Sequence, residues 1–282
     1  MTESERSGQK GVLVACQGTR GAYAQIAAAH LFPDGQFLYF KNFRAVARAV
    51  SAGMCRYGVL PIENNTYGSV RDVYRVIGSE QVSIARGFTL KIEHVLLARK
   101  NISLGDITTV CSHEQALGQC SEFLHGLGDK VRIMPCLNTA VAARYVAESP
   151  ESGAAAIASP ECASLYGLNV IRKNIADSDS NYTRFICVSN EPEILPGANR
   201  ISIMFTLPHR PGSLAHVLSL FADAGINLLK IESEPIPGKE FEFRFYIDLD
   251  AAGAEESAGE ILARLARECP SYRFLGQYTE EV

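Results

Sequence analysis

Short apolar runs alternate with polar segments along the first two thirds of the chain. The buried strands that these runs predict lie at residues 12–16, 37–40, 57–62, 107–111, 131–135 and 154–158. Several runs are followed by a polar turn and then by apolar residues at helical spacing. This repeat of strand, polar helix start and helix predicts parallel α/β sheets whose helix N-termini gather at one edge. A looser alternation over residues 82–97 interrupts the repeat and indicates two lobes with a cleft between them.

The pattern changes after residues 189–199, where two prolines, a glycine and several acids indicate a linker. The elements expected beyond it are strands at 201–207, 227–233, 241–249 and 272–275, a turn at Pro237 and Gly238, and helices at 211–225 and 256–268. This βαββαβ order is the ferredoxin-like unit. Because it carries no cluster of catalytic-looking side chains, a regulatory or oligomerising role is expected for it.

These breaks predict the organisation of the whole chain. We expect a polar N-terminal tail (1–10), a catalytic region (11–189), a linker (190–199) and a regulatory domain (200–282). Within the catalytic region, lobe A is expected to cover about 11–87 plus 176–189, and lobe B about 88–175. No helical segment precedes residue 12, so a monofunctional chain and a part of a longer fusion both stay open.

Composition narrows the choice of partners. The net charge of −4 gives no global attraction for nucleic acid or an anionic membrane, so a positive field for an anionic ligand must be local. No stretch approaches a membrane span, and the polar start lacks the apolar core of a secretory signal. The eight cysteines form no CxxC pair, which favours free thiols in the cytoplasm over disulfides or zinc.

The stretch whose side chains best suit catalysis is DSDSNYTRF, residues 177–185. It places Asn181, Thr183 and Arg184 at the mouth of a buried strand, where α/β folds commonly put their chemistry. Thr183 offers a hydroxyl donor, and Arg184 offers a planar fork that suits a carboxylate. A solvated loop with a capping threonine and a surface arginine would give the same spacing, so this alternative stays open on spacing alone.

Polar residues also lie at the N-termini of several predicted helices. The glycine-punctuated turn at 17–22 exposes backbone N–H groups to an anion, although it lacks the third glycine of a dinucleotide-binding fingerprint. The segment 63–69 holds more polar residues than capping requires. Ser112 is predicted to cap a helix in a capping box with Gln115, and Asn138 to cap another. His94 is expected to be a satisfied core residue beside the site. Each helix N-terminus favours an anion by about 0.3–1 kcal/mol, so several together could hold a dicarboxylate.

Five motifs together resemble the prephenate dehydratase family. They are GTRGAYAQIAA, LPIENNTYGSV, SHEQALGQC, NTAVAA and YGLNVIRKNIADSDSNYTRF, the last ending in the TRF of residues 183–185. Residues 200–275, with HRPGSLAHVLSLFADAGINLLKIESEP, resemble an ACT domain. The resemblance implies a two-lobed, type II periplasmic-binding-protein-like catalytic region followed by a ferredoxin-like ACT domain. It implies conversion of prephenate to phenylpyruvate in phenylalanine biosynthesis, without metal or organic cofactor, in a homodimer or homotetramer that phenylalanine regulates.

The resemblance also assigns roles to residues of this chain. Thr183 matches the family's catalytic threonine, and its expected role is proton donation or hydrogen bonding to the leaving hydroxyl. Arg184 and Asn181 are expected to be catalytic residues with it, Arg184 by anchoring a carboxylate or by ordering the loop. The expected substrate-binding residues are Thr19, Arg20, Gly21, Ala22, Glu63, Asn64, Ser69, Ser112, His113, Gln115 and Thr139. Glu63 is expected either to tune the site or to point away from a dianion. The expected phenylalanine-binding residues are Arg210, Pro211, Gly212, Ser213, Leu214, Ala215, Asn227, Leu228, Glu232 and Ser233.

Four positions depart from the family pattern. Ala24, Asn65 and Asn138 stand where hydroxyl residues are common, and Glu234 stands where many members have arginine. The charge reversal at Glu234 is expected to weaken phenylalanine binding or an intersubunit pair. Two other functions stay open: an arogenate dehydratase, and a non-catalytic amino-acid-sensing binding protein. No residue in the sequence decides between prephenate and arogenate.

Overall fold

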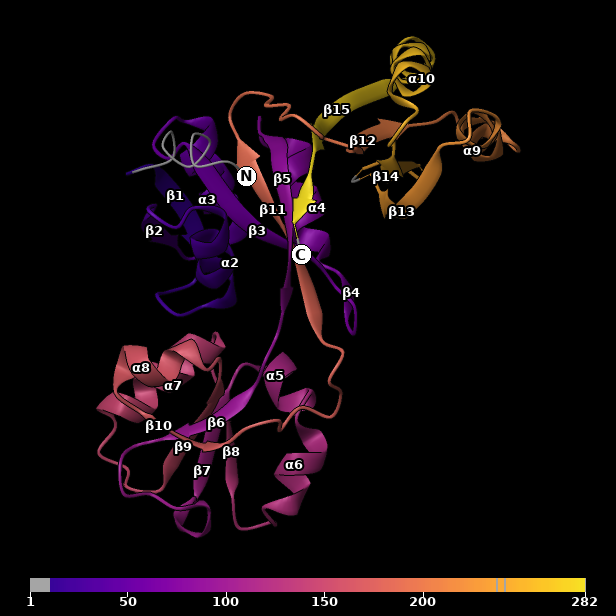
Figure 1. Cartoon of the computed structure of the whole chain (residues 1–282). Coiled ribbons are helices and arrows are strands. Elements are labelled where there is room, and N and C mark those ends of the chain that lie inside the picture. The colour runs from indigo at the N-terminus through magenta and orange to yellow at the C-terminus, as the bar shows by residue number, and fades with distance from the viewer. Residues whose placement is uncertain (1–10, 237, 241, 282) are drawn as a thin grey trace.

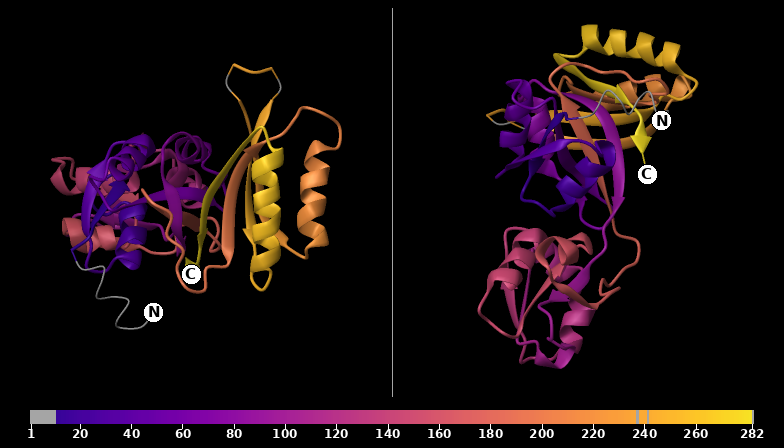
Figure 2. Two further views of the ribbon diagram at one scale, coloured as in Figure 1. Left: turned by 90° about the horizontal axis from the view of Figure 1, so that it is seen from above. Right: turned by 60° about the vertical axis from the view of Figure 1, so that its left-hand side comes forward.

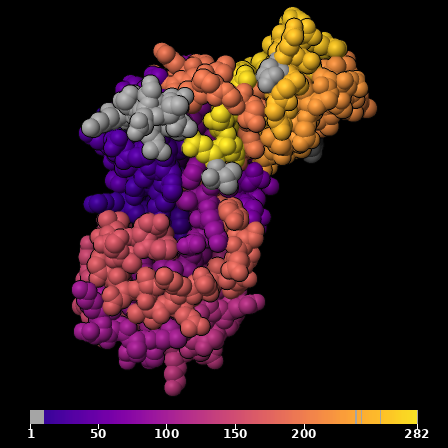
Figure 3. Space-filling model, in the orientation of Figure 1, coloured from indigo at the N-terminus to yellow at the C-terminus, as the bar shows by residue number. Residues whose placement is uncertain are grey.

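The computed structural model describes residues 11–236, 238–240 and 242–281. Lobe A lies above lobe B, and a C-terminal domain projects from the side of lobe A (Figures 1 and 3). The predicted tail over residues 1–10, Pro237 of the predicted turn and Phe241 of the predicted strand fall outside the described residues. No helix in the described part of the chain is long and apolar enough to cross a membrane.

Lobe A is built on a seven-stranded sheet in the order β16-β5-β11-β3-β1-β2, with β4 paired to β3. Its strands are β1 (Leu13–Gln17), β2 (Gln36–Phe40), β3 (Tyr57–Asn64), β4 (Gly68–Ser69), β5 (Ser83–Lys91), β11 (Tyr182–Ser189) and β16 (Glu280–Glu281). Strands β1, β2 and β3 are parallel, but β11 runs antiparallel to both β3 and β5. The sheet is therefore mixed. The parallel sheet expected from the repeat was therefore wrong here, because β11 enters from the other lobe and runs antiparallel to both of its neighbours.

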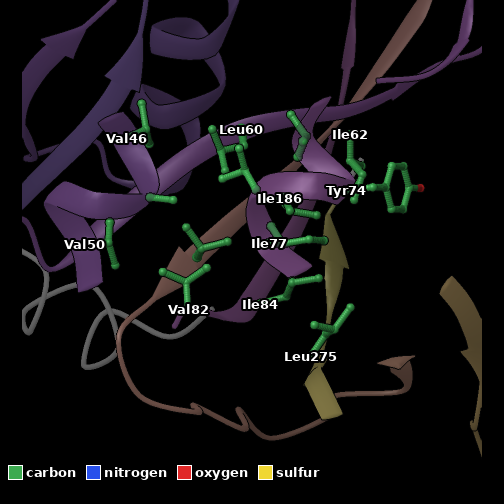
Figure 4. Close-up of a cluster of buried hydrophobic side chains, with 14 of the residues drawn as sticks. Val46, Val50, Leu60, Ile62, Tyr74, Ile77, Val82, Ile84, Ile186 and Leu275 are labelled. Atoms are coloured by element: carbon green, nitrogen blue, oxygen red, sulfur yellow. The ribbon is translucent and has the colours of Figure 1, made fainter. Parts of the chain in front are cut away.

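The helices of lobe A cover both faces of this sheet. They are α2 (Tyr23–Leu31), α3 (Phe43–Ser51) and α4 (Arg71–Ser79). Helix α2 buries its apolar side on one face, and α3 and α4 bury theirs on the other. Figure 4 shows the cluster on the face covered by α3 and α4, to which Val46, Ile77 and Ile186 of lobe A and Leu275 of the C-terminal domain belong. Asn42 caps α3 as predicted, because its Oδ1 accepts a hydrogen bond from Ala45 N at 2.9 Å.

Lobe B contains a five-stranded sheet in the order β10-β6-β9-β7-β8. Its strands are β6 (Val95–Ala98), β7 (Thr109–Ser112), β8 (Arg132–Pro135), β9 (Ala154–Ala158) and β10 (Asn169–Arg172). Its helices are η2 (Leu104–Asp106), α5 (Glu114–Gly118), α6 (Ser121–Gly126), α7 (Thr139–Glu148) and α8 (Glu161–Tyr166). Helix α7 presents small side chains to the fully buried β9, so the two pack closely.

The chain passes between the lobes twice, after β5 and again before β11 (Figure 1). The first passage follows Lys91, a few residues later than the predicted boundary near residue 87. The returning strand β11 inserts between β3 and β5. The resulting order β2-β1-β3-β11-β5 is the arrangement expected for a type II binding-protein-like lobe, so this part of the predicted fold class is confirmed.

The start of α5 differs from the prediction. Ser112 is not the N-cap, because it is the last residue of β7 and its Oγ donates to the Ile157 carbonyl of β9 at 2.6 Å. The N-cap is His113, whose Nδ1 accepts from Gln115 N at 3.3 Å. The single helix expected here is also interrupted, giving α5 and α6.

The C-terminal domain has the predicted βαββαβ order. Its sheet runs β13-β14-β12-β15, from β12 (Arg200–Thr206), β13 (Asn227–Pro235), β14 (Phe243–Asp250) and β15 (Ser271–Tyr278). Helices α9 (Ser213–Asp223) and α10 (Glu255–Glu268) cover one face, as Figure 2 shows from above. After β15 the chain returns to lobe A, where β16 pairs in parallel with β5. The sequence did not predict this last strand.

The other face of the C-terminal sheet packs on lobe A. Met204, Tyr246 and Leu275 join the core cluster around α4. Tyr246 donates its hydroxyl proton to the Tyr74 carbonyl at 2.9 Å, and the two rings lie edge to face at 5.0 Å. The C-terminal domain is therefore in direct contact with the lobe that carries β11.

Candidate active site

A pocket of about 260 Å³ lies between the two lobes. Lobe A supplies one wall, lobe B supplies the other, and the passage after β5 supplies the back. The lining residues are Gln17, Ala22, Tyr23, Ala24, Phe43, Pro61, Asn64, Val70, Ile92, His94, His113, Gln115, Ala116, Gln119, Leu137, Asn138, Thr139, Thr183 and Phe185. Amides, imidazoles and hydroxyls thus share the lining with apolar side chains, as in a site that binds and orients a polar small molecule.

Four helices begin at this pocket. The N-cap residues of α2, α4, α5 and α7 are Ala22, Val70, His113 and Asn138, and all four line it. The first-turn N–H groups of a helix lack intrahelical partners and carry partial positive charge. Among the described residues that line the pocket there is no lysine, arginine, aspartate or glutamate. The local positive field therefore comes from helix ends and side-chain amides.

Thr183 lies in the pocket beside Asn64, its cross-strand partner on β3. The amide of Asn64 is held in one orientation, because its Oδ1 accepts from Thr66 N and Tyr67 N at 3.0 Å each. Its Nδ2 consequently donates to Thr183 Oγ1 at 2.9 Å. Because the Asn64 amide donates the hydrogen of this bond, Thr183 Oγ1 is the acceptor. The hydroxyl proton of Thr183 is therefore available to a group in the pocket.

Asn181 lies behind Thr183 and does not line the pocket. Its side chain is 3% exposed, and its Oδ1 accepts from Asn64 Nδ2 at 2.9 Å. Its backbone carbonyl accepts from Ile92 N at 2.8 Å, which joins the two passages between the lobes. Asn181 therefore supports the Asn64–Thr183 pair. The geometry does not place it against a substrate, as its predicted catalytic role required.

Arg184 also differs from the prediction. Adjacent residues of a strand point to opposite faces, so Arg184 faces away from the pocket that contains Thr183. Its guanidinium donates to Asp248 at 2.6 Å, to Glu280 at 2.8 Å and to the Tyr278 hydroxyl at 2.6 Å. The guanidinium is thus engaged by the C-terminal segments of the chain. Of its two expected roles, anchoring a substrate carboxylate does not fit this geometry, whereas ordering the local chain does.

Glu63 of β3 and Ser69 of β4 also bind the C-terminal domain. Glu63 points away from the pocket and accepts from Lys230 Nζ at 2.6 Å, which matches the second of its two expected orientations. Ser69 Oγ donates to Glu232 at 2.6 Å. Ser69 lies on a groove that adjoins the pocket, not in the pocket itself. Neither side chain is placed to bind a ligand in the pocket, which corrects their assignment as substrate-binding residues.

The glycine-rich turn after β1 contributes fewer residues to the pocket lining than predicted. Ala22 lines the pocket, but Thr19, Arg20 and Gly21 do not. Gly21 has φ +86°, and a Cβ there would lie 2.9 Å from a Leu165 methyl of α8. The carbonyl of Arg20 accepts from Tyr166 of α8 at 2.7 Å. Arg20 and Gly21 therefore join the two lobes, and because none of the three residues lines the pocket, their assignment as substrate binders is corrected. Ser112 is likewise excluded, because it is buried and bonded within lobe B.

Of the remaining predicted binders, His113, Gln115 and Thr139 lie in the pocket on lobe B, opposite Thr183 and Asn64. Leu137 stands at the rim with 82% of its surface exposed. The helix that Thr139 begins is capped as predicted, because Asn138 Oδ1 accepts from Val141 N at 2.8 Å.

Tyr23, His94 and Gln119 form a chain of three side chains at the back of the pocket. His94 is the satisfied core residue expected beside the site, whereas the sequence missed Tyr23 and Gln119. Tyr23 Oη lies 3.1 Å from His94 Nδ1, and His94 Nε2 lies 2.8 Å from the Gln119 amide. His94 is 4% exposed, and burial lowers the pKa of its imidazole, which favours the neutral ring. Gln119 follows Gln115 by four residues, a spacing that puts both on one helix side and could have identified it.

The predicted phenylalanine-binding residues are divided between two places. Arg210, Ser213 and Leu214 line a cavity of about 100 Å³ at the start of α9, where Gly212 is the N-cap with φ +85°. Pro211 and Ala215 belong to the same turn and helix start. The set on β13 lies outside this cavity, and it comprises Asn227, Leu228, Glu232 and Ser233. Within one chain, the predicted phenylalanine-binding residues therefore do not line a single cavity.

The fold and the pocket define a two-lobed α/β protein for a small anionic ligand, with a ferredoxin-like C-terminal domain. The model of the prephenate dehydratase family matches residues 14–193, and that of the ACT domain matches residues 201–269. The chain belongs to the prephenate dehydratase family and carries a C-terminal ACT domain. It is accordingly an enzyme of the hydro-lyase class.

Similar proteins span nearly the whole chain. Arogenate dehydratase/prephenate dehydratase 2 of Arabidopsis thaliana is 37% identical over 99% of this chain and 75% of its own length. The structure of prephenate dehydratase from Arthrobacter aurescens in complex with L-Phe is 30% identical, with a TM-score of 0.87 over 95% of this chain and 90% of that one. A structure described as GqqA, a novel type of quorum quenching acylase, is 27% identical, with a TM-score of 0.83 over 94% and 97% of the two chains.

Proposed function

We propose that the protein catalyses the decarboxylating dehydration of prephenate to phenylpyruvate in phenylalanine biosynthesis. The observation that carries this proposal is the Thr183 hydroxyl, which lies in the pocket while Asn64 donates a hydrogen bond to its oxygen. The family to which the chain belongs and the four helix N-termini at the pocket support the same reaction.

The reaction requires little covalent help from the protein. The bond between the ring and its carboxylate breaks and releases carbon dioxide, and that electron pair enters the ring. The ring becomes aromatic as the C–O bond at its opposite carbon breaks. The departing hydroxide takes up one proton and leaves as water. We assign Thr183 as the donor to that oxygen, a contribution typically of about 10²–10⁴ in rate.

The pocket suits the charge of prephenate, which carries two carboxylates. Each helix N-terminus stabilises a nearby anion by about 0.3–1 kcal/mol, so the four starts act together without a cationic side chain. Gln115 and Thr139 offer further donors on lobe B. Because no described residue that lines the pocket is a carboxylate, the site adds no repulsion against the dianion.

Arogenate is the second candidate substrate. The Arabidopsis relative is named for both dehydratase activities, which favours this candidate. Arogenate has an ammonium group where prephenate has a keto oxygen. An ammonium is best paired with a carboxylate, and the described lining residues supply none. This argument favours prephenate. A non-catalytic binding protein is disfavoured, because binding alone needs no hydroxyl held with its proton toward the ligand.

We further propose that phenylalanine binds the ACT domain and regulates turnover, in a homodimer or homotetramer. The Arthrobacter aurescens structure, described as a complex with L-Phe, supports the effector. Because the turn at Arg210 and strand β13 do not share a cavity in one chain, residues of a second copy could complete the site. All eight cysteines are free, which suits a reducing compartment such as the cytoplasm.

The test is turnover of prephenate and of arogenate by the wild type, Thr183→Ala and Thr183→Ser. We expect Thr183→Ala to lower kcat about 10²–10⁴-fold with little change in KM, because it removes a donor needed in the transition state. Thr183→Ser retains the hydroxyl and is the matched control, with kcat near that of the wild type. Undiminished turnover by Thr183→Ala would refute the proposed role of Thr183. Absence of turnover of both prephenate and arogenate by the wild type would refute the proposed dehydratase function.

A further inference from the structure

Two adjacent rungs of the β3–β11 ladder face in opposite directions. In the first rung, Asn64 pairs with Thr183, and both side chains lie in the pocket. In the second rung, Glu63 pairs with Arg184, and both side chains reach the C-terminal domain. The reaction site and the contact with the C-terminal domain therefore occupy neighbouring residues of the same two strands.

The C-terminal domain meets this second rung with a rung of its own. Lys230 of β13 and Asp248 of β14 are register partners, just as Glu63 and Arg184 are. Lys230 donates to Glu63 at 2.6 Å, and Arg184 donates to Asp248 at 2.6 Å. We call these residues the four-charge cluster. Its positive and negative groups alternate, so every charge has an opposite charge as its register partner and is bonded to another across the interface.

The cluster is shielded from water on its Arg184 side. Arg184 and Asp248 are 8% and 7% exposed. Further bonds orient the carboxylates, since Ser202 donates to Asp248 at 2.5 Å and Arg200 pairs with Glu280 at 2.9 Å. Glu280 of β16 also accepts from Arg184 and from Thr89 of β5. Removing one member of such a buried network leaves an opposite charge less well compensated, which favours a shift of the strands.

We propose that Lys230 and Asp248 of the C-terminal domain are positioning residues for Thr183 and Asn64, and that they act through Glu63 and Arg184. A shift of the second rung is passed to the first, because the two rungs share a continuous backbone ladder. This inference rests on the proposed function for its kinetic readout. It assigns the C-terminal domain a direct part in holding the reaction geometry, where a misplacement of about 1 Å can cost about 10²-fold in rate.

The same interface contains a matched control. Glu234 of β13, 9% exposed, forms an ion pair with Arg75 of α4. This pair also joins the C-terminal domain to lobe A, but neither residue belongs to the two rungs. Its loss should loosen the interface without moving Thr183. The pair also shows that the negative charge at position 234 has a partner within the chain.

The experiment compares three amide or neutral variants in the full-length protein: Asp248→Asn, Lys230→Gln and Glu234→Gln. We expect Asp248→Asn and Lys230→Gln to lower kcat by about 10- to 100-fold with KM within about twofold, as for misplacement of a group that acts in the transition state. Glu234→Gln should keep the wild-type kcat. Thermal melting of each variant separates loss of fold from loss of positioning, and Lys230→Gln is the milder change should Asp248→Asn fold poorly.

A second readout does not need turnover. The γ-methyl resonance of Thr183, assigned by its absence in Thr183→Ser, reports on the position of that side chain. It should move in Asp248→Asn and Lys230→Gln and stay in place in Glu234→Gln. Folded Asp248→Asn and Lys230→Gln variants whose Thr183 resonance is unmoved would overturn the inference, whatever the substrate. A wild type that turns over neither prephenate nor arogenate would instead overturn the proposed function, while the resonance still tests the positioning.

Discussion

The amide of Asn64 determines what the hydroxyl of Thr183 can do. Two backbone N–H groups hold its oxygen, so its nitrogen faces Thr183 and cannot be exchanged with the oxygen without losing both bonds. Sequence reasoning found Thr183 and Asn64 because they lie in motifs that resemble a known family. It did not find that Arg184 faces the other way, since the partners that bind it, Asp248 and Glu280, lie far along the chain.

His94 gives a prediction about stability and pH. Burial lowers the pKa of its imidazole below the ordinary 6.5, so the folded protein holds this ring neutral where the unfolded chain protonates it. The unfolded state then binds more protons in the window between the folded pKa and 6.5. We expect the free energy of unfolding contributed by this group to be fully present above that window and to fall as the pH decreases through it.

The measurement is urea unfolding of the wild type and of His94→Asn across that range. The variant should lose the part of the pH dependence that His94 contributes, while the dependence due to other groups remains. An unchanged slope in His94→Asn would contradict the assignment.

At the scale of elements, the caps were predictable where the capping bond is local. Asn42 and Asn138 each accept from a backbone N–H three residues ahead, and the sequence predicted both. Ser112 has the same sequence signature but is the last residue of β7. Its hydroxyl donates to the carbonyl of Ile157 on the neighbouring strand. Strands β10 and β16 were missed for a related reason, because each is defined by a partner strand distant in sequence.

The cap of α7 gives a second prediction, because this helix begins in the pocket. Asn138→Ala should lower the free energy of unfolding by about 1 kcal/mol, since the Val141 N–H loses its partner. Fraying of the first turn also weakens the field on the substrate, so KM should rise by about two- to fivefold, the equivalent of 0.3–1 kcal/mol. Asn138→Ser keeps a capping oxygen and should restore both values.

A remote cap distinguishes the two effects of that change. Ser103 caps η2 in lobe B through a capping box with Asp106, outside the pocket. Ser103→Ala should lower stability without changing KM for the substrate. If Ser103→Ala raised KM as much as Asn138→Ala, the effect would belong to lobe B as a whole and not to the helix start at the pocket.

At the scale of the whole molecule, the C-terminal domain is tied to lobe A by more than a linker. Its sheet shares the core around α4, and the final strand β16 joins the lobe A sheet beside β5. The order of the domains and the βαββαβ unit followed from the sequence, because both depend on local periodicity. The return of the chain end to the first sheet did not, since a two-residue strand has no periodicity to detect.

This attachment makes phenylalanine a test of how the domains communicate. We expect phenylalanine to raise the thermal midpoint and to change turnover, with a coupling of about 1–3 kcal/mol between effector and substrate sites. Equal turnover with and without saturating phenylalanine would contradict the proposed regulation. If β13 transmits the signal through the four-charge cluster, the change should appear in kcat more than in KM.

The turn before α9 offers a variant that weakens the effector site alone. Gly212 has φ +85° and open space around the position of a Cβ, so Gly212→Ala adds backbone strain of about 1–2 kcal/mol and no clash. Calorimetry should show weaker phenylalanine binding, with basal turnover kept. Gly197 of the linker has φ +79° and the same open surroundings, so Gly197→Ala adds equal strain away from the site. It should leave phenylalanine affinity unchanged, and equal loss in both variants would place the effector elsewhere.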